Sequence, residues 1–166
     1  MVKKKVKSSK IEMYIIDDFL SSEECDMIIN HIDNNNYAST IYKQAESKNA
    51  KSNVRTSKSS AMNVKKAPFI RDIDRRMSRA INVPLELGEP TQGQMYEVGD
   101  EFKDHCDFFK MDTVKDHTKN WGNRTWTFMI YLNDDCEGGE TTRLSLNTPL
   151  IVPQLVVVND HVIVAS

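Results

Sequence analysis

The sequence predicts an α+β fold, and three observations favour it. With 166 residues, of which 39% are hydrophobic, the chain is long enough for one domain with a real core. The first half contains two segments with apolar residues at helical spacing, and from Gly88 onward short β-forming segments alternate with Gly, Asn and Asp. Two helices followed by consecutive strands favour helices that support one sheet of a sandwich or small barrel.

The first ten residues, MVKKKVKSSK, hold a cluster of lysines and are expected to form a basic, solvated tail. The apolar h-region of a secretory signal does not follow these lysines, so we expect no secretory signal here. Residues 11–166 are expected to form a single domain, with helical support in residues 11–87 and a strand-rich core in residues 88–166.

The composition also limits the partners. The formal net charge of −2 gives no global attraction for nucleic acid, so we expect no nucleic-acid partner. No apolar run approaches the length that spans a bilayer, so no membrane partner is expected either. The three cysteines are odd in number and lack CxxC spacing, which favours a reducing compartment, the cytoplasm.

The first strand and helix follow directly from local signals. Ile11 to Leu20 is rich in β-forming residues and predicts a strand. Ser21 followed by Glu24 is a capping-box pattern, so a helix is expected from Ser22 to Asp33. The apolar face of this helix is supplied by three isoleucines, Ile28, Ile29 and Ile32.

The next two segments are a loop and a second helix. Asn34 to Ser60 is polar and without clear periodicity, which predicts a long loop with room for a short strand. Loops of this length are often lids or binding loops. Ala67 to Val83 has apolar residues at helical spacing with Pro68 at the first helical position, so it predicts an amphipathic helix.

The second half is expected to consist of strands separated by turns. The predicted strands lie within residues 91–99, 100–109, 124–133, 139–146 and 149–166. In the second of these, His105 and Asp107 are two residues apart, and a strand would point both side chains to the same face. From the residues alone, such a pair is an ion pair, an acid–base pair or part of a metal site.

An ordered series of motifs decides between these alternatives. YEVGDEF is followed by HCDFF, then by RTWTFMIYLND and GGET. Near the N-terminus stand MYIIDDFLSSEECDMII and VRTSKSS. This series, which covers Glu12 to Pro153, resembles the prolyl 4-hydroxylase-like branch of the iron(II)- and 2-oxoglutarate-dependent dioxygenases. The resemblance implies a double-stranded β-helix (jelly-roll) core supported by the N-terminal helices.

The resemblance also implies a function and a site. It makes His105 and Asp107 iron(II) ligands, since two histidines and a carboxylate leave open positions for oxygen chemistry. Tyr96, Thr127 and Tyr131 match positions that hold or surround 2-oxoglutarate. The implied reaction hydroxylates a peptidyl proline or similar residue in a peptide or protein, with succinate and CO2 as co-products. The resemblance also allows ascorbate as an accessory cofactor.

The chain departs from the family pattern downstream. The family has a second histidine ligand and then a lysine or arginine for the cosubstrate carboxylate, whereas here only His161 follows the GGET segment and Arg143 is the last cation. Three alternatives stay open. In the first, His161 and Arg143 replace the usual histidine and cation. In the second, the chain is a truncated relative with incomplete C-terminal strands. In the third, it is a non-catalytic module that binds a peptide or partner.

Overall fold

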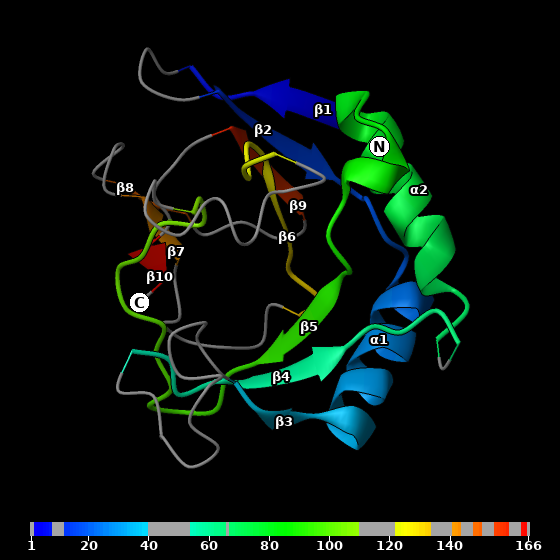
Figure 1. Ribbon diagram of the computed structural model, residues 1–166, viewed down its shortest axis with the longest axis vertical. Helices are drawn as coiled ribbons and strands as arrows, with labels where there is room; N and C mark the ends of the chain where they lie inside the picture. The colour runs from blue at the N-terminus through cyan, green and yellow to red at the C-terminus, as the bar shows by residue number, and fades with distance from the viewer. Residues whose placement is uncertain are drawn as a thin grey trace. The chain divides into compact units, whose positions relative to one another are not determined.

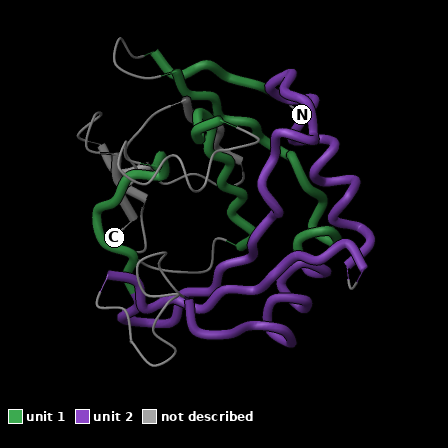
Figure 2. Tube along the Cα trace, in the orientation of Figure 1, with its two compact units in different colours: residues 1–25, 101–166 green, residues 26–100 purple. Residues whose placement is uncertain are grey.

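The computed structural model describes residues 2–7, 12–39, 54–65, 67–109 and 122–133, together with the backbone of four later strands. The chain divides into two compact units (Figure 2). Unit 1 contains residues 1–25 and 101–166, and unit 2 contains residues 26–100. The single domain over residues 11–166 and its internal boundary at residue 88 stay predictions.

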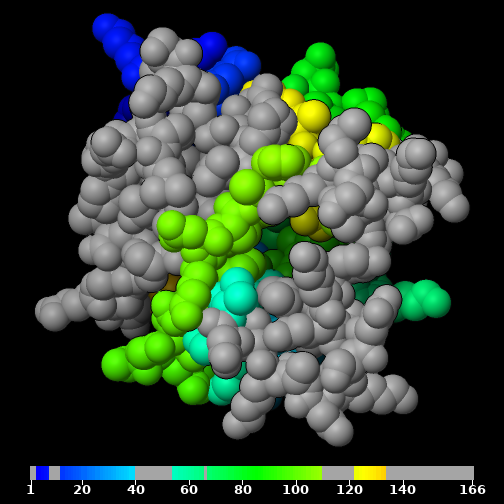
Figure 3. All heavy atoms as spheres, turned by 60° about the vertical axis from the view of Figure 1, so that its left-hand side comes forward, coloured from blue at the N-terminus to red at the C-terminus, as the bar shows by residue number. Residues whose placement is uncertain are grey.

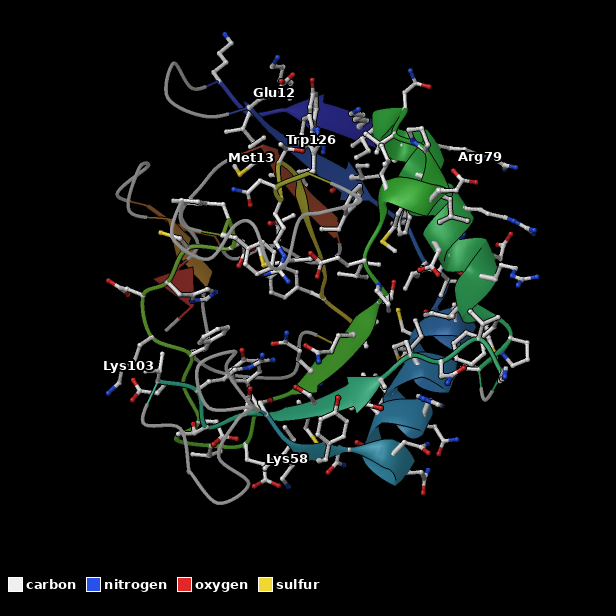
Figure 4. The ribbon with its side chains drawn as sticks, in the orientation of Figure 1. Glu12, Met13, Lys58, Arg79, Lys103 and Trp126 are labelled. Carbon is white, nitrogen blue, oxygen red and sulfur yellow. The ribbon has the colours of Figure 1, made fainter. Side chains whose placement is uncertain are left out.

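Unit 1 contains a four-stranded antiparallel sheet, shown in Figure 1. Its strands, in spatial order, are β1 (Val2–Lys5), β2 (Glu12–Asp17), β9 (Leu155–Asn159) and β6 (Thr127–Ile130). The predicted strand over residues 11–20 is confirmed in β2, whose side chains Met13 and Ile16 are almost completely buried. Trp126, which precedes β6, lies beside Tyr14 of β2 with 6.4 Å between ring centroids (Figure 4).

Strand β1 lies where the sequence predicts a solvated tail. It pairs antiparallel with β2, so that Lys5 is opposite Tyr14. Lys4 forms an ion pair with Asp17 at 2.6 Å, and Lys5 forms one with Glu12 at 3.0 Å. Cross-strand pairs of opposite charge stabilise a sheet, and lysines protect an exposed edge from further pairing. The lysine run is therefore compatible with a strand at the edge of the sheet.

Helix α1 (Ser22–Asn35) confirms the first predicted helix and extends it by two residues. The capping box is present, because the backbone N–H of Ser21 donates to Glu24 Oε2 at 2.9 Å. In return, the backbone N–H of Glu24 donates to Ser21 Oγ at 3.3 Å. Two of the N–H groups that a helix start leaves without partners are thus satisfied.

We expect Ser21→Ala to lower the free energy of unfolding by about 1 kcal/mol, because the variant cannot accept the hydrogen bond from Glu24 N–H. Urea unfolding followed by circular dichroism measures the difference. Ser22→Ala is the matched control, since Ser22 is exposed in the first turn of α1 and makes no capping bond there. Equal stabilities of the two variants would contradict the capping role.

Unit 2 contains a three-stranded antiparallel sheet with the order β3 (Tyr37–Ala38), β4 (Lys58–Ala61) and β5 (Gln92–Met95). Both β3 and β4 fall within or at the end of the long loop predicted for residues 34–60, and residues 40–53 of that loop lie outside the described residues. Helix α1 covers one side of β5, because a Cβ atom built on Gly93 would come within 2.6 Å of Ile32.

Helix α2 (Ile70–Ile81) confirms the second predicted helix but begins later. Pro68 precedes the helix instead of occupying its first position, since a turn with a hydrogen bond from Ile70 N–H to Ala67 O comes first. Ile70 and Ile73 are buried. The helix ends at Asn82, which adopts a left-handed conformation with φ 56° and is followed by a 3₁₀ turn, η2 (Leu85–Leu87).

Unit 1 also contains a three-stranded sheet with the order β10 (Val164–Ala165), β7 (Thr141–Arg143) and β8 (Thr148–Leu150). The described elements thus form a mixed α/β fold with antiparallel sheets, which agrees with the coarse fold prediction. Closure of the strands into a jelly roll stays a prediction. Among the described residues, neither α-helix has the length and apolar character needed to cross a bilayer.

Candidate metal and cosubstrate site

The segment from residue 101 to residue 109 differs from its predicted strand. It forms only isolated bridges at Phe102 and His105, with bends between them. The His105 and Asp107 side chains nevertheless meet, with 3.4 Å between His105 Nε2 and Asp107 Oδ1. They are 18% and 21% exposed, and the yellow-green segment that leads to residue 109 lies at the surface in Figure 3. The pair is therefore accessible from solvent but mostly sheltered.

The imidazole of His105 is held by two contacts within its own segment. Its ring stacks on Phe102, with centroids 3.6 Å apart and planes 12° from parallel. Its Nδ1 lies 2.7 Å from the backbone carbonyl oxygen of Lys103. Because a carbonyl oxygen only accepts, Nδ1 must carry a hydrogen, so Nε2 is the ring nitrogen that either donates to Asp107 or, without its proton, offers a lone pair to a metal. Metal-binding histidines are commonly oriented in this way.

Asp107 is anchored from the residues around strand β6. Thr127 Oγ1 donates to Asp107 Oδ2 at 2.6 Å, while Arg124 Nη1 donates to the backbone oxygen of Asp107 at 3.0 Å. Burial raises the pKa of the Asp107 carboxyl, but the hydrogen bonds from His105 and Thr127, together with the charges of His105 and Arg124, lower it by more. The pKa of Asp107 is consequently below its ordinary value, so the group is a carboxylate at neutral pH.

We expect Thr127→Val to raise the pKa of Asp107 and to lower the free energy of unfolding by about 1–2 kcal/mol at pH 7. A depressed carboxyl pKa contributes stability above the pKa of the unfolded chain, near 4, and this contribution disappears as pH falls through the pKa of the folded state. The difference from wild type should therefore shrink as pH falls below about 4. Urea unfolding at several pH values tests this.

Thr127→Ser is the control for this prediction, because it keeps the hydroxyl that donates to Asp107 and removes only a methyl group. It should retain the low pKa of Asp107, which carboxyl carbon shifts in NMR report directly. A Thr127→Val variant with the same carboxyl titration as wild type would contradict the proposed effect of the hydroxyl.

Asn123 adds a connection that the sequence does not predict. Its side-chain oxygen accepts from the backbone N–H of Phe109 at 2.8 Å, and its side-chain nitrogen donates to Phe109 O at 2.9 Å. The guanidinium of Arg124 lies 4.5 Å from the centre of the Phe109 ring. The two hydrogen bonds of this side-chain amide therefore attach the end of the Asp107 segment to the residues before β6, although the segment itself forms no regular strand. The only sequence signal was the Gly-Asn turn pair before the predicted strand.

The residues predicted to contact 2-oxoglutarate are divided between the units. Thr127 lies on β6 beside Asp107, and Tyr131 follows β6 and is half-buried. Tyr96 belongs to unit 2, is half-exposed and donates from its hydroxyl to Gln94 Oε1 at 3.1 Å. Partial burial raises the pKa of Tyr96, and Ser57 and Arg55 oppose that rise only in part.

Two further candidates are not placed in full. His161, the alternative third ligand, lies outside the described residues. Arg143, the alternative cosubstrate cation, is on β7, but the structure describes only its backbone. Within the described residues, no cluster of three or more His, Cys, Asp or Glu side chains is placed to hold a metal. His105 and Asp107 therefore provide two donors of the predicted set of three.

Comparison with known proteins agrees with the motifs. Residues 91–164 match the model of the 2OG-Fe(II) oxygenase superfamily. A protein named probable prolyl 4-hydroxylase 10 of Arabidopsis thaliana is 36% identical over 124 residues, which is 75% of this chain and 42% of that protein. Prolyl 4-hydroxylase 1 of the same plant is 37% identical over 142 residues, 84% of this chain and 49% of the relative.

The chain spans less than half the length of these curated relatives. The matched residues 91–164 include strands β5 and β6, His105 and Asp107. Residues 91–164 therefore belong to the 2OG-Fe(II) oxygenase superfamily, and most of the chain is related to the Arabidopsis prolyl 4-hydroxylases.

Proposed function

We propose that this chain carries an iron(II)- and 2-oxoglutarate-dependent hydroxylase site whose iron is held by His105 and Asp107. The observation that supports it most is the pair itself: His105 Nε2, the ring nitrogen that the contact with Lys103 O leaves available, stands 3.4 Å from an oxygen of the Asp107 carboxylate. An imidazole and a carboxylate are two of the three donors of the iron(II) sites that activate oxygen. The donor chemistry of the pair therefore fits the metal.

The residues around the pair have distinct tasks in this proposal. Lys103 O and Phe102 fix the imidazole, and the Thr127 hydroxyl orients Asp107 and contributes to its lowered pKa. When bound, iron(II) and 2-oxoglutarate would supply an oxidative decarboxylation with O2 as the oxidant, in which one oxygen atom enters succinate as CO2 leaves and the other is inserted into a C–H bond of the substrate. Tyr96, Thr127 and Tyr131 are proposed to contact the cosubstrate, as the resemblance implies.

The names of the relatives support the choice of substrate. They are prolyl 4-hydroxylases, so we propose that a prolyl residue in a peptide or protein is hydroxylated. Ascorbate is proposed as an accessory cofactor from the resemblance alone. His161 is the proposed third ligand, because it is the only histidine that follows the GGET segment in the sequence.

The test is an anaerobic titration of the purified chain with iron(II) and 2-oxoglutarate, observed as the visible charge-transfer band of the chelated metal. We expect the band to appear and saturate in wild type and to be absent in His105→Ala. His161→Ala should also lack the band if His161 is the third ligand. No band from a chain that circular dichroism shows to be folded would overturn the proposal and favour a module that binds a peptide without turnover.

A further inference from the structure

Helix α2 carries a row of three arginines on its exposed side. Arg71, Arg75 and Arg79 are four residues apart, so successive positions differ by only about 40° around the helix. All three are exposed, whereas Ile70 and Ile73 on the opposite side are buried. Figure 4 shows the Arg79 side chain extending away from α2. The row, called here the arginine row, repeats a positive charge about every 6 Å along the helix.

The stability of the helix does not explain the arginine row. Positive charges four residues apart repel each other, and Arg71 lies in the first turn, where the helix dipole favours negative charge. The two acidic residues of α2 have other partners within the described residues, since Asp72 pairs with Arg76 at 3.4 Å and Asp74 accepts from Thr91. The helix dipole favours only Arg79, in the last turn, so helix stability leaves Arg71 and Arg75 unexplained, which favours a use outside the fold.

Apolar surface continues the row at the C-terminal end of α2. Leu85 and Leu87 of η2 are 38% and 52% exposed, and η2 contacts α2. An open hollow at this end of α2 is lined by Arg79 of the row together with Ser78, Asn82, Val83 and Pro84. Arginines next to exposed apolar side chains are typical of protein interfaces. This composition therefore favours an interface over a solvated helix face.

We propose that the arginine row and η2 bind an acidic helical segment of a partner protein. Carboxylates four residues apart on a helix repeat with the same spacing as the row, so each can face one guanidinium. An apolar side chain beyond the last carboxylate would cover the hollow and the leucines. The net charge of −2 opposes association with a polyanion such as nucleic acid but not with a local acidic face. This surface belongs to unit 2 alone and is independent of the proposed hydroxylase site.

A labelled peptide of about 15 residues, long enough to populate a helix, tests the proposal by fluorescence anisotropy. It carries three glutamates spaced by four and a leucine one turn later. We expect saturable binding that weakens with salt, and a loss of about tenfold in affinity for Arg75→Glu. Leu87→Ser should weaken binding by about fivefold. A peptide of the same composition with its glutamates scattered around the helix should bind much less well.

Lys65→Glu is the matched control, since Lys65 is exposed in the same unit and its reversal changes the net charge equally. Its affinity should stay within about twofold of wild type. Arg75→Gln, a neutral change, should give an intermediate loss, and circular dichroism of both Arg75 variants checks that they are folded. Equal binding of the two peptides, or no effect of either Arg75 variant, would overturn the proposal. Tighter binding of a single-stranded oligonucleotide than of the peptide would also overturn it, in favour of a phosphate ligand.

Discussion

Asp107→Asn is expected to weaken iron(II) binding by about 100-fold or more. Loss of an outer partner of a metal ligand already costs 10- to 100-fold in affinity, and this change removes the charge of a proposed ligand itself. The amide keeps the shape of the carboxylate and an oxygen that can accept from Thr127, so the local packing is preserved. Anaerobic calorimetric titration with iron(II) measures the affinity, and the visible band with 2-oxoglutarate gives an independent signal.

Asp104→Asn is the matched control, because Asp104 is an exposed carboxylate in the same segment and its change removes the same charge. It should bind iron(II) like wild type. The comparison separates a ligand from a general electrostatic effect near the site. If Asp107→Asn also binds like wild type, the His105–Asp107 contact is an ion pair only, and the proposed metal site must be abandoned.

The elements that local chemistry determines could be predicted from the sequence. The capping box places the start of α1 because Ser21 and Glu24 act on each other within one turn. The strand β2 and the amphipathic α2 follow from the spacing of their apolar residues. In contrast, β1 was missed because a run of lysines shows no apolar alternation. Its lysines pair with Asp17 and Glu12 on the next strand, 13 and 7 residues further along the chain, and such cross-strand ion pairs leave no apolar pattern.

The candidate site shows the same limit. The sequence predicted that His105 and Asp107 stand together, but through a strand that the structure does not contain. His105 is held by Phe102 and Lys103 within its own segment. Asp107 and the nearby Phe109 are held by side-chain contacts from Asn123, Arg124 and Thr127, up to about twenty residues away in the chain. Hydrogen bonds between a side chain and a distant backbone group leave no periodic pattern, so no reading of residue spacing could have found them.

Gly93→Val is expected to lower the free energy of unfolding by about 3 kcal/mol, at the upper end of the cost of overpacking. A Cβ at this position of β5 would lie 2.6 Å from Ile32 Cγ1 and 2.8 Å from its Cδ1, closer than real contacts allow. Ile32 is 4% exposed and branched at Cβ, so its side chain cannot turn out to solvent or adopt many other rotamers. Either α1 or β5 must shift. Urea unfolding measures the loss.

Gln92→Val is the matched control, since it places the same side chain on the neighbouring, exposed position of β5 and should change stability by less than about 0.5 kcal/mol. The contact with Ile32 can be isolated with smaller changes. Gly93→Ala introduces the clashing Cβ, and Ile32→Ala removes both atoms that it would meet. The double variant should therefore lose less stability than the sum of the two single variants. Additive losses would mean that the cost at Gly93 arises in the strand backbone and not in the packing of α1 against β5.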